Sequence, residues 1–365
     1  MGAETLTSSP SFSKEFRRST RQAPAANNAP VNELFLALGP DQVLTAVEAL
    51  GLETTGHILP LHCYENRVYD LKLEGNEHVV AKFYRPARWS REAIREEHQF
   101  LLELQEAEVP VCAPLVVDGE TVFEVDEILY AVWPRTGGRA PAELDDDQLR
   151  VLGRLLARIH NVGAMHDAPH RPRLDRDRYI REPVKMLQSG PFLPPQWSGR
   201  YAAAAERLGD AFESAAQDVP RHRIHGDCHL GNLLHGRDGW FFLDFDDMLE
   251  GPAVQDLWML VPERSAEGER QREVFLEGYR QFRDFESKWL RLVEPLRGLR
   301  YVYYASWLAR RWSDPAFPNS FPHFNTEAYW ERETIDLEGQ ATRAERAVSG
   351  LEASLGAQDP WAGRH

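Results

Sequence analysis

Two carboxylates and one carboxamide stand at spacings that could serve phosphoryl transfer. Asp227 follows His225-Gly226, Asn232 comes five positions later, and Asp244 ends the apolar run 240–243. Phosphoryl transfer from a nucleotide needs one carboxylate beside the acceptor hydroxyl, together with an amide oxygen and a second carboxylate on Mg²⁺. A tight loop followed by a short hairpin would bring all three groups to one point. We therefore predict Asp227 and Asp244 as catalytic carboxylates, and Asn232 and Asp244 as Mg²⁺ ligands.

The spacing of these residues also matches a known pattern. Asp-x4-Asn is the spacing of the kinase catalytic loop, and Leu243-Asp244-Phe245 stands where the metal-binding Asp-Phe-Gly stands. Asp and Asn are common turn residues, so any one of them could instead cap a turn. The combination of all three favours a phosphotransferase.

A cation for the nucleotide phosphates is available at Lys82, in the middle of the apolar stretch 79–84. Such a lysine is either an outward-facing edge charge or a functional cation. Glu97 falls on the apolar stripe of the next predicted helix, where a charge is costly unless it is paired. Glu96 falls on the polar face of that helix. We predict that Lys82 binds the phosphates and pairs with Glu97.

The elements around these residues change character along the chain. Alternating apolar residues over 69–73 and the run 79–84, separated by Gly75-Asn76, predict a hairpin. Ser90 is a suitable N-cap for a helix that extends to Ala107. Further strands are expected at 114–117, 121–125 and 128–133, and helices at 145–160, 201–216, 269–285 and 294–312. Strands first and helices later indicate an α+β chain with segregated parts.

The order of these elements suggests four regions. We expect a disordered N-terminal tail over 1–30, an N-lobe over 31–134 with the antiparallel sheet and a helix, a mainly helical C-lobe over 135–345, and a C-terminal tail over 346–365. The N-lobe would bind the nucleotide. The C-lobe would carry the catalytic loop, the metal site and the acceptor site.

Composition narrows the possible partners. The 365 residues are 42% hydrophobic and carry a formal net charge of −15, without a basic stripe, so nucleic acid is not an expected partner. No run of about 18 apolar residues is present, so we expect no membrane span. Three cysteines argue against a disulfide framework and favour a reducing compartment. We expect a cytoplasmic monomer.

Several stretches together resemble the aminoglycoside-phosphotransferase and choline-kinase superfamily, and within it the bacterial stress response kinase A group of serine/threonine protein kinases. The superfamily resemblance lies in 63–69, 80–86, 225–232 and 243–247. The resemblance to the group adds 96–100, 251–259 and 311–318, and the whole extends from about residue 33 to about residue 340.

This resemblance implies a two-lobed, protein-kinase-like fold that uses ATP and Mg²⁺. It implies that Asp227 is the catalytic base and that Asp256 braces the catalytic loop. It further implies nucleotide contacts from the loop over the phosphates and from the backbone of the segment around the adenine, which gives the candidates Cys63, Tyr64, Glu65, Asn66, Val132 and Trp133. The chain departs from the kinase pattern because this loop has no glycine and because Asp246 replaces the glycine of Asp-Phe-Gly.

The acceptor is the open question at this level. The resemblance favours a protein serine or threonine in a stress response. A kinase for choline, homoserine or an aminoglycoside, or a non-catalytic pseudokinase scaffold, is the alternative. Two other classes of protein match parts of the sequence. Asp244-x-Asp246 after an apolar strand suits a haloacid-dehalogenase-type phosphatase, although Met248 stands where Thr or Val is usual. His225, Cys228 and His229 could belong to a zinc module.

Overall fold

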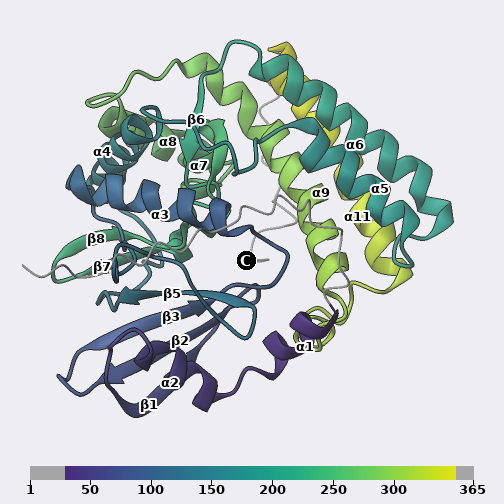
Figure 1. The fold of residues 1–365 in the computed structure, drawn as a ribbon. Coiled ribbons are helices and arrows are strands. Elements are labelled where there is room, and N and C mark those ends of the chain that lie inside the picture. The colour runs from purple at the N-terminus through teal and green to yellow at the C-terminus, as the bar shows by residue number, and fades with distance from the viewer. Residues whose placement is uncertain (1–28, 351–365) are drawn as a thin grey trace, which may run out of the picture.

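The computed structural model describes residues 29–350, which form a sheet-containing part and a larger helical part (Figure 1). The expected tails, 1–30 and 346–365, lie mostly outside the described residues. Where they overlap with them, helix α1 (Ala29–Ala37) begins at Ala29 and helix α11 (Glu327–Ser349) continues to Ser349.

The sheet has five antiparallel strands in the order β1-β2-β3-β5-β4. The strands are β1 (Thr54–Leu61), β2 (Arg67–Leu73), β3 (His78–Phe83), β4 (Phe123–Val125) and β5 (Ile128–Pro134). Side chains alternate between the two faces of a strand. Ala81, Phe83 and Val132 therefore pack with the buried residues of α1 and α2 (Pro40–Glu48). Lys82 projects from the opposite face, toward the helical part.

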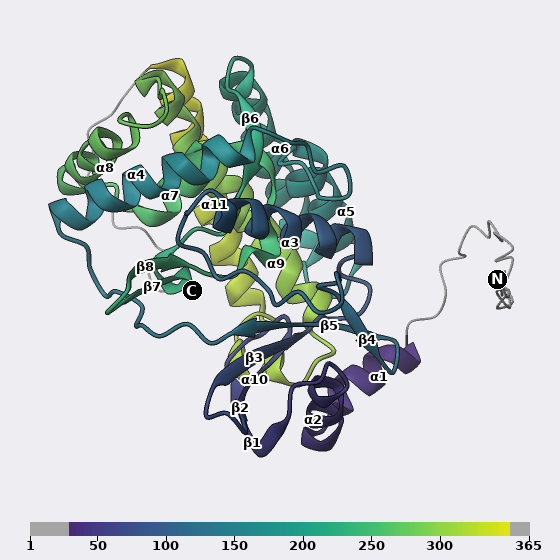
Figure 2. The same ribbon diagram turned by 60° about the vertical axis from the view of Figure 1, so that its left-hand side comes forward.

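Helix α3 (Arg91–Glu106) lies between the sheet and the helical part (Figures 1 and 2). The hydroxyl of Ser90 accepts a hydrogen bond from the backbone N–H of Ala93 at 3.1 Å, which confirms the predicted N-cap. Glu97 lies on the buried stripe of this helix beside Phe100 and Leu101, and only 1% of its surface is exposed.

The helical part begins after β5. Its helices are α4 (Asp146–Gly163), α5 (Glu182–Ser189), α6 (Pro195–Ala216), α7 (Val254–Leu260), α8 (Ala266–Tyr279), α9 (Val293–Arg311), α10 (Ala316–Ser320) and α11. Helices α6, α9 and α11 pack together, as Figure 1 shows. Two antiparallel strand pairs are set among them, namely β6 (Arg221–Ile224) with β9 (Leu249–Pro252), and β7 (Leu233–Gly236) with β8 (Gly239–Phe242). The predicted α+β class is confirmed.

Some elements differ from the predictions. In the expected strand 114–117, only Val117 forms a bridge, to Glu120. The helix expected over 269–285 begins at Ala266 and ends at Tyr279. The sequence analysis did not find α1, β1, α5, α7 or α11. All seven residues of α7 are buried, so this helix has no polar face and no amphipathic pattern to detect.

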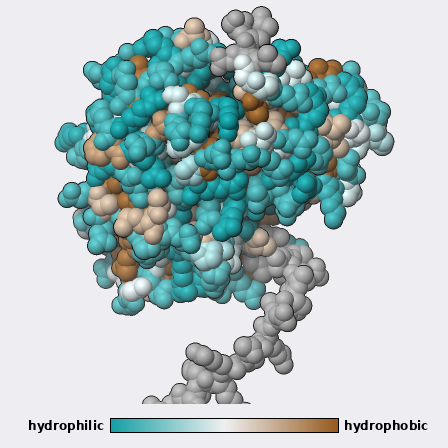
Figure 3. Space-filling model, turned by 90° about the horizontal axis from the view of Figure 1, so that it is seen from above, coloured by the Kyte–Doolittle hydropathy of each residue, from teal (hydrophilic) through white to brown (hydrophobic). Residues whose placement is uncertain are grey.

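One face of the molecule is mainly polar. In the view of Figure 3, most side chains are hydrophilic, and the apolar ones occur in small separate groups. No helix within residues 29–350 combines the length and the apolar character needed to cross a membrane.

Close contact between α4 and α8 depends on two glycines. A Cβ atom at Gly278 would lie 2.1 Å from the carbonyl oxygen of Arg150, and one at Gly153 would lie 2.2 Å from that of Phe275. No side chain fits between the two backbones at these points, so these glycines allow the helices to approach.

We expect Gly278→Ala to lower the free energy of unfolding by about 1–3 kcal/mol, because the added methyl overpacks the contact. Alanine favours a helix over glycine by only ~1 kcal/mol, which does not compensate. Urea denaturation measures the change. In the control Gly339→Ala on α11, the nearest atom to the new Cβ is Arg343 Nη1 at 3.6 Å, so stability should stay constant or rise. Equal effects of both substitutions would contradict the packing argument.

Candidate active site

The β7–β8 hairpin brings the three predicted chemical groups together. Its register pairs Leu233 with Phe242 and continues one step further, where the N–H of Leu243 donates to the carbonyl oxygen of Asn232 at 2.9 Å. Asn232 therefore lies opposite Leu243 and next to Asp244. The side-chain amide of Asn232 also donates to the carbonyl oxygen of Asp227 at 2.9 Å. The structure thus brings Asp227, Asn232 and Asp244 to the same end of the hairpin.

A buried carboxylate supports the catalytic loop from behind. Asp256 accepts hydrogen bonds from the backbone N–H groups of His225 at 2.9 Å and Gly226 at 2.8 Å. His160 lies 3.0 Å from the same carboxylate and 2.8 Å from the hydroxyl of Tyr279. Burial holds the pKa of His160 well below its ordinary value, so the neutral ring donates to Asp256 and accepts from Tyr279. Burial raises the pKa of Asp256 to about 6.

Gly226 is required by the shape of this loop. Its φ of +86° lies in the left-handed region that glycine adopts easily. A Cβ atom there would lie 2.2 Å from the carbonyl oxygen of Asp247. Two loops therefore touch at this residue, namely 225–232 and 243–247, which we call the catalytic loop and the metal-binding loop after their predicted roles.

Asp227 is held by two basic side chains. Arg300 of α9 lies 2.7 Å from one carboxylate oxygen, and the Nε2 atom of His229 lies 3.5 Å from the other. Burial opposes the charge of Asp227, but Arg300 and His229 together keep its pKa well below the ordinary value. The carboxylate is therefore ionised, as a group that orients a hydroxyl must be.

Lys82 pairs with the metal-binding loop and not with Glu97. Its Nζ atom lies 3.1 Å from Asp244 Oδ1 and 3.0 Å from Asp246 Oδ1. Burial alone would lower the pKa of Lys82, but these carboxylates and Glu97 raise it well above its ordinary value. The pairing differs from our prediction because Asp246, at the position of the kinase glycine, turns inward toward Lys82.

Glu97 has a different partner, Arg171, whose Nη1 atom lies 3.7 Å away. Burial raises the pKa of Glu97 to about 7, against the opposing effect of Lys82. Glu97 therefore acts on Lys82 through the local field and not through an ion pair. The distinction from Glu96 holds in the structure, since Glu96 binds the backbone N–H of His170 at the surface.

Arg171 shapes the metal-binding loop, and the sequence analysis missed it. Its fully buried guanidinium donates to the carbonyl oxygens of Asp246 and Met248, the latter at 2.8 Å. It thus fixes the turn in which Asp244 adopts a left-handed conformation, with φ of 56°. Non-glycine residues hold such a conformation only where their surroundings impose it. Arg171 lies in an irregular segment, where no periodic pattern identifies a buried charge.

The loop after β1 is predicted to lie over the phosphates. Most of its side chains contact other side chains of the protein. Glu65 binds Arg311 and accepts from the indole N–H of Trp307 at 2.7 Å. The side-chain amide of Asn66 donates to Asp246 at 3.2 Å, and Tyr64 packs against the ring of Trp307. Within residues 62–66, backbone groups and the half-buried Cys63 remain the candidates for phosphate contact. Burial and nearby Asp244 raise the pKa of the Cys63 thiol.

The two candidate residues near the adenine lie on opposite faces of β5. Val132 is fully buried against α1 and α2, and its carbonyl oxygen accepts from the N–H of Leu115 at 2.7 Å. Its buried side chain faces away from Lys82, so the expected nucleotide contact from this residue would come from its backbone. Trp133 faces the other way, with its ring centre 5.9 Å from Lys82 Nζ.

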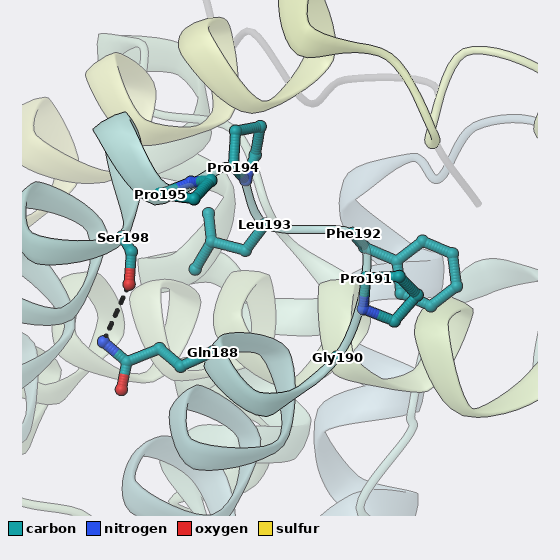
Figure 4. A pocket seen from close by; sticks show the side chains of 8 residues that line it. All are labelled: Gln188, Gly190, Pro191, Phe192, Leu193, Pro194, Pro195 and Ser198. Carbon is teal, nitrogen blue, oxygen red and sulfur yellow. Dashed lines mark hydrogen bonds between the residues drawn. The ribbon is translucent and has the colours of Figure 1, made fainter.

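Two other features do not contribute to this site. Within residues 29–350, no three His, Cys, Asp or Glu side chains gather closely enough to hold a metal ion, so the zinc alternative has no support. A cavity of about 610 Å³ lies at the turn between α5 and α6 (Figure 4). It is lined by Gln188, Ser198 and a Pro-rich stretch, 190–195, and it contains no ionisable side chain.

Comparison with known proteins agrees with this geometry. The family described as "Phosphotransferase enzyme family" matches residues 58–292. Stress response kinase A of Escherichia coli (strain K12) is 41% identical over 308 residues, which cover 84% of this chain and 94% of that protein. "Serine/threonine protein kinase RdoA" of Salmonella typhimurium is 42% identical over 301 residues, which cover 82% and 92%.

Solved structures support the fold. Amicoumacin kinase hAmiN in complex with AMP-PNP, Ca²⁺ and Ami matches with a TM-score of 0.66 and 19% identity, over 82% of this chain and 94% of that one. Spectinomycin phosphotransferase in complex with ADP and spectinomycin matches with a TM-score of 0.59 and 14% identity, over 83% and 98%. At such identities the matches establish a shared fold, and this fold gives no support to a haloacid-dehalogenase-type phosphatase.

We expect Arg171→Gln to lower the free energy of unfolding by about 3–5 kcal/mol, because it leaves Glu97 and the loop carbonyls buried without their cation. Urea denaturation measures the change. The matched control is Arg173→Gln, two residues away, where an arginine with 67% of its side chain exposed binds Glu250. That surface pair should contribute less than about 1 kcal/mol. Similar losses in both variants would contradict the role of Arg171.

Proposed function

This chain belongs to the phosphotransferase enzyme family and, within it, to the stress response kinase A proteins, and we propose that it transfers the γ-phosphate of ATP to a serine or threonine hydroxyl of a protein. The observation that carries the proposal is that Asp227, Asn232 and Asp244 meet at the open end of the β7–β8 hairpin, where the buried Lys82 contacts Asp244. The protein acceptor is supported by the curated relatives, one of which is described as a serine/threonine protein kinase.

Each of these residues has a separate role in the proposed phosphoryl transfer. Asp227, ionised and half-buried, orients the acceptor hydroxyl and accepts its proton as the new P–O bond forms. Lys82 binds the phosphates, for which it must exchange Asp244 for a phosphate oxygen. Trp133 lies on the same face of the sheet as Lys82 and supports the nucleotide there.

The oxygen donors fit Mg²⁺. The amide nitrogen of Asn232 donates to the backbone, which leaves its carbonyl oxygen free, and 47% of the Asp244 side chain is exposed. Carboxylate and amide oxygens are the ligands that Mg²⁺ prefers. When bound, Mg²⁺ neutralises charge on the transferred phosphoryl group. Asp246 is held between Lys82 and Arg88, so we assign it to pairing and not to the metal.

We further propose that the chain divides after Pro134, where β5 ends, into a nucleotide-binding lobe and an acceptor-binding lobe. Cys63, Cys112 and Cys228 are all free thiols, which supports a protein that works in the reducing cytoplasm. We expect it to act there as a monomer.

Asp227→Asn should reduce phosphoryl transfer at least ~100-fold while ATP binding stays nearly unchanged, because the amide cannot accept the hydroxyl proton. Transfer is measured with radiolabelled ATP on the protein itself and on general protein acceptors, and binding by calorimetry. Asp238→Asn, an exposed aspartate in the β7–β8 turn, is the control. Near-normal transfer by Asp227→Asn would refute the assignment.

Asp244→Asn should weaken nucleotide binding only when Mg²⁺ is present, because it removes an anionic oxygen ligand of the metal. Titration of ADP affinity against Mg²⁺ tests this, with binding in EDTA as the reference. If the Mg²⁺ titrations of the variant and the wild type superimpose, Asp244 is not a metal ligand.

A further inference from the structure

Next to Asp227, the π-helical turn Asp177–Arg181 and helix α9 bring cationic and aromatic side chains together. On α9, Tyr303 follows Arg300 by three residues and so lies on the same face. The ring of Tyr179 lies 4.7 Å from that of Tyr303. The guanidinium of Arg178 lies 6.0 Å from the ring centre of Tyr303 and 5.7 Å from that of Trp89.

One arginine of this group is not paired with a carboxylate. Arg300 is paired with Asp227, and Arg88 is paired with Asp246 and Asp247 at 2.7 Å each. Arg178 has no carboxylate within 4.0 Å among residues 29–350, and its Nε atom is buried without a hydrogen-bond partner. A half-buried polar group without a partner is costly. In a chain with a formal charge of −15, an arginine without a carboxylate partner suggests that an anion completes the site.

We propose that the acceptor site selects a serine or threonine that has an anionic side chain, a carboxylate or a phosphate, one to three residues away, and that Arg178 binds this anion. The inference rests on the proposed protein-kinase function and specifies its substrate. Arg178 and Arg300 would repel a cationic acceptor placed against Asp227. The arginines therefore distinguish an anionic acceptor from positively charged acceptors such as choline.

The spacing supports this arrangement. Tyr303, which contacts Arg178, is three residues from Arg300, a rise of roughly 5 Å along the helix. An extended peptide advances about 3.3 Å per residue. A peptide with its hydroxyl at Asp227 therefore reaches Arg178 with a side chain a few residues away. Trp89 and Tyr303 flank the guanidinium, and its N–H groups suit a planar carboxylate or a phosphate.

The test uses serine peptides that are identical except for Asp, phosphoserine, Ala or Lys at one to three positions from the acceptor. For the full-length wild type, we expect kcat/KM to be at least about tenfold higher with Asp or phosphoserine than with Lys. Arg178→Gln should lower this ratio of kcat/KM values about tenfold, mainly by raising KM for the Asp and phosphoserine peptides. The control Arg181→Gln, from the same turn, should keep it, because Arg181 is 53% exposed and paired with Asp177.

Charge reversal separates specificity from misfolding. Arg178→Glu should shift the preference toward Lys-flanked peptides, a gain that an unfolded protein cannot show. Labelling by the wild type that is independent of the flanking residues would overturn the inference while the kinase function stands. Label on choline or an aminoglycoside, with none on any peptide or on the protein itself, would overturn the proposed function and this inference with it. The Asp and phosphoserine peptides show which anion Arg178 prefers.

Discussion

Burial of Asp246 between several cations is the interaction on which the site depends. Its carboxylate lies 3.0 Å from Lys82 of the sheet and 2.7 Å from Arg88, just before α3, and it accepts from the amide of Asn66. Burial disfavours the charge, but Arg88, Lys82 and Arg171 hold the pKa of Asp246 below its ordinary value. Removing one partner from such a network leaves an uncompensated buried charge. The sheet, α3 and the metal-binding loop are thereby held in a single arrangement.

The same network also explains why the buried Lys82 is charged. A lysine buried among apolar strands would lose its proton if it had no partner, because burial disfavours the ammonium. Asp246 and Asp244 keep it charged. Of these two carboxylates only that of Asp244 is substantially exposed, so under the proposed function a phosphate would replace Asp244 at Lys82 while Asp246 stays in place. Because Asp246 remains paired with Lys82, the ammonium group keeps a negative partner while Asp244 is replaced.

Local spacing allowed the grouping of Asp227, Asn232 and Asp244 to be predicted, because their positions follow from one turn and one hairpin. Alternation identified β2, a short apolar run identified β3, and an N-cap identified α3. The Lys82–Glu97 pair was wrong as a direct contact because the choice between carboxylates depends on how Asp246 turns, and tertiary packing decides that. Arg171 and Arg311 come from distant segments, and their buried contacts leave no periodic trace in the sequence.

Helix α9 connects the nucleotide side of the site with the acceptor side. Near its middle, Arg300 holds Asp227, while Trp307 and Arg311 near its end hold Glu65 in the loop after β1. Arg300 and Arg311 are about 16 Å apart along the helix axis. Arg85 of the sheet part reinforces the second contact through Asp314, at 2.9 Å. Because one rigid helix bears both contacts, a shift of the nucleotide loop that moves α9 also moves Arg300 against Asp227. The position of the Asp227 carboxylate is therefore coupled to that of the loop after β1.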